Sequence, residues 1–224
     1  FYMIAGGLGD ARGIGIERLA AWARKLGFGE PTGIDLPQEA SGFLPSPEWK
    51  KTTKGESWYI GDTYHAAIGQ GDVLVTPVQL AVATATVANG GTLLAPRLID
   101  AIEGANGSLK ERIPPAIRSE RAIKPETAAS VRAGMRGAVT GGSARGLESL
   151  PIAAAAKTGT AQIGGTDRTH AWVTTFAPYD DPDLALVVLL EGTGGGGDRF
   201  AVPVARDILS WYFAPEQQAR RKKE

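Results

Sequence analysis

At 224 residues the chain is long enough for one large domain or for one and a half ordinary ones. It carries 24 Lys and Arg against 24 Asp and Glu, and this zero net charge argues against a nucleic-acid binder that works through bulk charge. Hydrophobic residues at 43% suffice for a core, which excludes wholesale disorder. The sequence has no cysteine, so disulfides, thiolate metal sites and a cysteine nucleophile are excluded as well.

The first two thirds of the sequence show start and stop signals of helices. Helices are predicted over about 16–26, from a capping box at 76–79 to residue 89, and from Pro125 to residue 140. In the first helix, Leu19, Trp22, Ala23 and Leu26 recur on one face, which predicts that this face is buried. The proline- and glycine-rich segment 28–72 reads as irregular, and 100–120 as a strand-and-loop excursion.

In the last third of the sequence, the pattern changes to the period-two alternation that is typical of β-strands. Three strands are predicted, over 153–161, 169–176 and 184–190, and a closing helix over 201–213. The connections between the strands are short and rich in turn residues, which favours an antiparallel meander because parallel pairing needs a longer crossover. We therefore predict an α+β fold, an antiparallel sheet with helices packed on it, in which the closing helix covers one face.

A glycine run after the third predicted strand formally matches a dinucleotide-binding fingerprint. Gly192-Thr193-Gly194-Gly195-Gly196-Gly197 fits G-x-G-x-x-G, follows a strand and precedes a helix. Only 27 residues remain after Gly197, so neither a second parallel strand nor a ribose-binding acid can follow. The run is interpreted as a flexible connection, and a nucleotide site is rejected.

Asp62, His65 and His170 are candidates for a metal or acid–base cluster. Two histidines without cysteine make a poor zinc set, because closed sites need four ligands and catalytic sites three. A lone histidine in a loop is more often a structural hydrogen-bonding group. A Ser-His-Asp hydrolase finds no support either, since no serine lies in a G-x-S-x-G elbow.

The sequence Lys157-Thr158-Gly159-Thr160 lies on the first strand of the predicted meander. The alternation of a strand puts the hydroxyls of Thr158 and Thr160 on the same side, where both can donate to one substrate carboxylate. Gly159 between them lets a ligand backbone approach the strand, and Lys157 would attract an anionic substrate. Taken alone, the same residues also fit an edge strand with a surface lysine.

The surrounding blocks decide between these interpretations. K-T-G is the third element of a serine acyl-transferase set with S-x-x-K and S-D-N. The accompanying blocks are Thr32–Pro37, Pro47–Lys50, Trp58–Thr63, Ala67–Gly71, Thr76–Gln79, His170–Val173 and Phe176–Pro178. Together they resemble the transpeptidase domain of class B penicillin-binding proteins, elongation type, from Phe1 to about residue 213. The resemblance implies part of a penicillin-binding/transpeptidase (serine β-lactamase-like) fold.

That resemblance implies a peptidoglycan D,D-transpeptidase, which cross-links stem peptides during cell elongation through an acyl-enzyme on a serine and is a target of β-lactams. Lys157 would belong to the hydrogen-bond network of the active site. Thr158 and Thr160 would bind the terminal carboxylate of stem peptide or β-lactam. Gly159 would leave room for the acyl group, and the Thr160 backbone N–H would contribute to the oxyanion hole.

The resemblance also implies surroundings for the protein. The domain would work at the periplasmic face of the cytoplasmic (inner) membrane, held there by an N-terminal membrane anchor that this sequence lacks. Its partners would be peptidoglycan stem peptides and a polytopic glycan polymerase of the rod-shape system. No cofactor, no metal and no nucleic acid are implied.

Two motifs of the set are missing from these 224 residues. None of the nine serines is followed by Lys at the third position, and none by Asn or Asp at the second. The sequence opens on Phe1 rather than Met, so we expect 1–213 to be the C-terminal portion of a transpeptidase domain, followed by a charged tail over 214–224. We expect this chain alone to be inactive. The alternative is a non-catalytic module that keeps the fold and binds cell-wall peptides or protein partners.

Overall fold

The structure is a computed structural model that describes residues 1–221 and divides them into two compact units. Unit 1 comprises Phe1–Ala83 and Thr92–Ala122, and unit 2 comprises Thr84–Gly91 and the residues from Ile123 onward. Helix α5 (Pro77–Ala88) begins in the first unit and ends in the second. The predicted α+β class is confirmed.

Unit 1 contains more helix than strand, together with irregular segments and three small antiparallel strand pairs. Its helices are α1 (Tyr2–Gly6), α2 (Gly15–Lys25), α3 (Pro47–Trp49), a π-helical turn (Lys50–Lys54) and α4 (Ile60–Ala67). Its strands are β1 (Gly7–Leu8), β2 (Ala11–Arg12), β3 (Leu93–Ala95), β4 (Ala101–Glu103), β5 (Leu109–Arg112) and β6 (Ala116–Ser119). β1 pairs with β2, β3 with β6 and β4 with β5, so the strand-and-loop excursion over 100–120 is confirmed.

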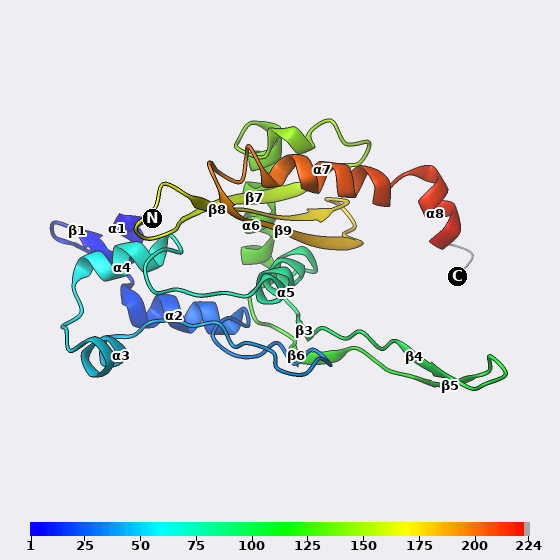
Figure 1. The fold of residues 1–224 in the computed structure, drawn as a ribbon, viewed down its shortest axis with the longest axis horizontal. Helices are drawn as coiled ribbons and strands as arrows, with labels where there is room; N and C mark the ends of the chain where they lie inside the picture. The colour runs from blue at the N-terminus through cyan, green and yellow to red at the C-terminus, as the bar shows by residue number, and fades with distance from the viewer. Residues whose placement is uncertain (222–224) are drawn as a thin grey trace. The chain divides into compact units, whose positions relative to one another are not determined.

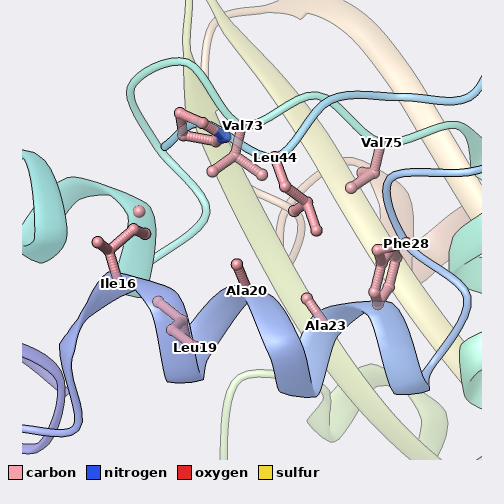
Figure 2. Close-up of a pocket in the computed structure, with 10 residues that line it drawn as sticks. Ile16, Leu19, Ala20, Ala23, Phe28, Leu44, Val73 and Val75 are labelled. Carbon is pink, nitrogen blue, oxygen red and sulfur yellow. The ribbon is translucent and has the colours of Figure 1, made fainter. Parts of the chain in front are cut away.

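Helix α2 confirms the first predicted helix, and its inward face keeps Leu19 and Ala23 of the predicted face but is shifted toward Ile16 and Ala20. Ile16 and Ala20 are buried, whereas Trp22 is 50% exposed and lies under the Lys25 ammonium. The inward face borders an apolar cavity of about 180 Å³, shown in Figure 2. Its lining residues are Ile16, Leu19, Ala20, Ala23, Phe28, Leu44, Pro45, Ala66, Val73 and Val75.

The segment expected to be irregular contains helix α4, and an ion pair joins this helix to the π-helical turn. The Lys50 ammonium, on a side chain only 8% exposed, lies 2.8 Å from the Asp62 carboxylate and 3.3 Å from Glu56. The same carboxylate accepts a hydrogen bond from the Tyr59 backbone N–H at 2.7 Å and so caps the first turn of α4. Asp62 thus caps the start of α4 and also ties the helix to the π-helical turn through Lys50.

Unit 2 is built on a three-stranded antiparallel sheet, ordered β7-β8-β9, as the sequence predicted (Figure 1). Its strands are β7 (Ala155–Gln162), β8 (Thr169–Ala177) and β9 (Leu184–Thr193). Its helices are α6 (Pro125–Thr140), a 3-10 turn (Arg145–Leu147), α7 (Ala201–Tyr212) and α8 (Pro215–Arg221). The register places Thr158 opposite Val173 and Thr160 opposite Ala171.

Helix α7 covers one face of this sheet, which confirms the predicted closing helix (Figure 1). Ala156 and Val173 on that face pack with Val202, Ala205 and Leu209 of α7 in one core cluster. Within the segment predicted as a charged tail, α8 forms a helix in which Arg221 pairs with Asp183 at 2.9 Å. Residues 222–224 lie outside the described residues. Among residues 1–221, no helix has the length and apolarity needed to cross a bilayer.

Candidate active site

The Lys157–Thr160 sequence lies on β7, at one edge of the sheet. β7 pairs with β8 on one side, and in the part of the chain that the structure describes no strand pairs with its other edge. Lys157 and Thr160 are exposed, and Thr158 and Gly159 are partly buried. The four residues predicted as a site are therefore contiguous and open to a ligand that approaches the strand.

The core determines which way the two threonines face. Ala156 is fully buried in the core cluster that includes residues of α7, and the alternation of the strand puts Thr158 and Thr160 on the same face, opposite the buried Val173 and Ala171. Lys157 lies on the opposite face, and its ammonium donates a hydrogen bond to the backbone carbonyl of Thr158. The shared face of the two hydroxyls agrees with the alternation of the strand, and their donation to a single carboxylate stays a prediction.

Gly159 has a packing reason to be glycine in addition to the predicted one. It lies opposite Trp172 in the register, and a Cβ at this position would come within 3.2 Å of the Trp172 Cβ. Such a separation is tighter than ordinary side-chain packing. The glycine therefore admits the tryptophan on β8, and it leaves the strand without a side chain where a ligand would lie.

The glycine run 192–197 packs at its C-terminal part against Gly159 and Thr160 of β7, which corrects its interpretation as a merely flexible connection. A Cβ on Gly196 would lie 2.6 Å from the Thr160 hydroxyl oxygen, and one on Gly197 would collide with the Trp172 carbonyl. The hydroxyls of Thr169 and Thr193 lie 2.7 and 2.8 Å from the Gly195 carbonyl oxygen. The loop is thus held as a wall of the site, and glycine is required for its close approach.

Ser143 is a neighbour of the site that the sequence did not reveal. Its hydroxyl oxygen lies 2.6 Å from that of Thr158, although the two residues are 15 positions apart. The contact arises because the loop after α6 returns to the edge of β7. No motif in the sequence marks this serine, since it becomes relevant only through the fold.

The alternative candidates do not form a cluster. In the described part of the chain, no group of three or more His, Asp or Glu side chains could hold a metal ion. Asp62 is engaged by Lys50, as described above, and His65 follows it on the same helix. His170 lies on β8 opposite Ala161, and its Nδ1 is buried without a hydrogen-bond partner in the structure.

The apolar cavity beside α2 does not suit an ionised substrate. All its lining residues are apolar, so a carboxylate placed there would lose its hydration without gaining a donor (Figure 2). The exposed part of β7, by contrast, carries two threonine hydroxyls on one face and the Lys157 ammonium on the other. Of these two places, the exposed part of β7 is the one suited to bind an anionic group.

The fold and its Lys-Thr-Gly-Thr edge strand together indicate the family to which this chain belongs. The penicillin binding protein transpeptidase domain matches residues 9–210, and the chain belongs to this family. Peptidoglycan D,D-transpeptidase MrdA of Haemophilus influenzae is 35% identical to it over 222 residues, which are 91% of this chain and 34% of that protein. The chain therefore spans about a third of the length of the curated relatives it matches.

Solved structures of the same family share the fold. PBP2 of Pseudomonas aeruginosa, in complex with WCK 5153, matches with a TM-score of 0.75 and 35% identity, over 91% of this chain and 44% of that one. A structure described as the structural coordination of polymerization and crosslinking by a peptidoglycan synthase complex matches with a TM-score of 0.74 and 36% identity. The match covers 88% of this chain and 33% of the chain in that structure.

Proposed function

We propose that this chain is the C-terminal portion of the transpeptidase domain of an elongation-type peptidoglycan D,D-transpeptidase. The family membership over residues 9–210 and the MrdA relatives support this assignment. The observation that carries it is the Lys157–Thr160 strand, with two threonine hydroxyls on one face at the open edge of the sheet. The nucleophile would come from a segment outside these 224 residues, because no Ser-x-x-Lys occurs within them.

The chemistry would be acyl transfer through a serine ester. The serine oxygen attacks the carbonyl between the two terminal D-alanines, and the amide bond breaks as D-alanine leaves with the serine proton. The amine of a neighbouring stem peptide then attacks the ester, which forms the cross-link and returns the proton to the serine. β-Lactams would enter the same site and acylate the same serine.

Each residue of the strand would have a role in this reaction. The hydroxyls of Thr158 and Thr160 donate to the terminal carboxylate and so orient the scissile bond. Lys157 supplies positive charge to the hydrogen-bond network around the nucleophile. The Thr160 backbone N–H contributes to an oxyanion hole, and Gly159 leaves space for the acyl group.

The setting of the reaction follows from the same assignment. The substrate lies outside the cytoplasmic membrane, so the domain would act at the periplasmic face, held by a membrane anchor elsewhere in the polypeptide. A glycan polymerase of the rod-shape system would be its partner. The structure of a peptidoglycan synthase complex among the matches supports this pairing of polymerization and crosslinking.

A second candidate is a non-catalytic module that binds cell-wall peptide or protein partners. The absence of Ser-x-x-Lys from the 224 residues is the observation that favours it. The sequence of the locus upstream of the Phe1 codon separates the two. Transpeptidase function predicts Ser-x-x-Lys there, then Ser-x-Asn or Ser-x-Asp directly before Phe1. A start codon close to Phe1 would contradict it and favour the binding module.

A further inference from the structure

Ser143 brings a third hydroxyl group to the exposed part of β7. Its oxygen lies 2.6 Å from the Thr158 hydroxyl oxygen, a usual distance for a hydrogen bond between two hydroxyls. The side chain of Ser143 is exposed and that of Thr158 is partly buried, so the pair lies at the border between core and solvent. A ligand held by Thr158 would therefore meet the Ser143–Thr158 pair.

The fold holds Ser143 in place from both sides. Gly142 turns so tightly after α6 that a Cβ there would lie 2.9 Å from the Ala138 Cα. On the other side, the backbone N–H of Ala144 donates to the Ala138 carbonyl at 2.9 Å, and the Ala144 side chain is fully buried. Ser143 thus lies between two anchored residues, which fixes its backbone beside Thr158 of β7.

The proton count of the hydroxyls gives the pair a direction. A threonine hydroxyl has one proton to donate and two lone pairs, and a carboxylate only accepts. When the Thr158 proton points to a ligand carboxylate, the bond between the two hydroxyls requires Ser143 as the donor. A bond donated into the Thr158 oxygen also polarises its O–H and strengthens its donation to the ligand.

From this we propose that Ser143 is a positioning residue, whose hydroxyl donates to Thr158 and turns the Thr158 proton toward the terminal carboxylate of the bound peptide or β-lactam. The inference rests on the proposed function, because that function supplies the carboxylate. It has a specific consequence: the contribution of Ser143 depends on the negative charge of the ligand. A ligand whose carboxylate is esterified does not benefit from it.

The test compares a penicillin with its methyl ester on the complete polypeptide, meaning this chain together with the segment that bears the nucleophile. Second-order rate constants of acylation are measured for the wild type, Ser143→Ala, Ser143→Thr and the control Ser149→Ala. Ser149 is likewise exposed, six positions along the chain. We expect Ser143→Ala to slow acylation by the acid on the order of tenfold, as for a hydrogen bond to a charged group. Acylation by the ester should change less than about twofold, and Ser143→Thr should restore the rate with the acid.

The outcomes separate this inference from the proposed function. If Ser143→Ala slows acid and ester equally, or slows neither, the positioning role is wrong while the transpeptidase assignment stands. A wild-type protein that neither compound acylates would overturn the proposed function and the role of Ser143 with it. A loss confined to the acid, rescued by threonine and absent in Ser149→Ala, would support the role.

Discussion

Gly196 shows how much of the candidate site depends on a missing side chain. The loop 192–197 lies so close to Thr160 that a Cβ on Gly196 would come within 2.6 Å of the hydroxyl oxygen and 2.8 Å of an Asp198 carboxylate oxygen. An alanine here must displace the loop or rotate Thr160 out of the position in which we propose that it binds the ligand carboxylate. A Cβ on Gly194 in the same loop would meet no heavy atom within 4 Å, so this glycine offers a matched comparison.

We predict that Gly196→Ala slows acylation of the complete polypeptide by a penicillin roughly tenfold, because one hydrogen bond to the ligand carboxylate is lost or misplaced. Gly194→Ala should leave the rate within about twofold, since its methyl group meets nothing. Stopped-flow acylation kinetics of the two variants check this. Equal rates in both variants would show that the loop is not a wall of the site.

At the residue scale, the sequence was informative where a motif is contiguous and silent where contact comes from the fold. Lys157 to Thr160 follow one another along a strand. The alternation of side chains in a strand was therefore enough to predict that both threonine hydroxyls lie on one face. Ser143 reaches Thr158 only because the segment after α6 turns back, and nothing local encodes that return. The glycine run was visible, but its close packing against Thr160 was not.

Among the elements, α4 carries an ion pair, Lys50–Asp62, whose contribution to stability depends on pH. Burial opposes ionisation of Asp62, but the hydrogen bonds from Lys50 and the Tyr59 N–H outweigh it and hold the pKa of Asp62 below its ordinary value. The hydrogen bond to Asp62 raises the pKa of Lys50. The stabilisation is therefore fully present from about pH 4 to about pH 10 and is lost as the pH falls through the lowered pKa of Asp62 or rises through the raised pKa of Lys50.

Asp62→Asn should therefore be less stable than the wild type near neutral pH. Below about pH 4, the difference in the free energy of unfolding between the variant and the wild type should become smaller. Asp72→Asn is the control, because the Lys54–Asp72 pair has the same 2.8 Å separation but is about 40% exposed on both sides. Breaking that exposed pair should change the free energy of unfolding by at most about 1 kcal/mol. Thermal unfolding between pH 3 and 8 compares them. The account would be contradicted if Asp62→Asn lost less stability than Asp72→Asn, or if its loss of stability did not change with pH.

Helix α7 contributes several residues to the core of unit 2, and two adjacent residues on this helix differ sharply in burial. Leu209 is fully buried against the sheet, whereas Ile208 is 38% exposed. Leu209→Ala should lower the free energy of unfolding by about 2–5 kcal/mol, and Ile208→Ala by about 1 kcal/mol or less. Urea unfolding of the two variants tests this. Similar losses would mean that α7 does not pack as described.

Helices and strands were predictable where their ends carry local signals. The capping box before α5, the proline that opens α6 and the turns between the three strands gave those elements correctly. Helix α4 escaped prediction because it lies in a proline- and glycine-rich segment and is capped by a carboxylate inside its own first turn. Trp22 was expected in the core, but α2 buries the face of Ile16 and Ala20 instead.

For the molecule as a whole, the fold class and the family followed from ordered blocks spread along the chain. The candidate site could be predicted only in part, because these 224 residues hold the Lys157–Thr160 strand and no Ser-x-x-Lys. The central claim is that this strand serves a serine supplied by the rest of a transpeptidase. It follows that the chain and the complete polypeptide should differ in their reaction with penicillin.

The most direct test is covalent labelling with a reporter penicillin, followed by intact mass and peptide mapping, on both the isolated 224-residue chain and the complete polypeptide. We predict one acyl group on the complete polypeptide, at the serine of a Ser-x-x-Lys outside these residues, and none on the isolated chain. Stoichiometric acylation of the isolated chain, or no acylation of the complete polypeptide, would contradict the account.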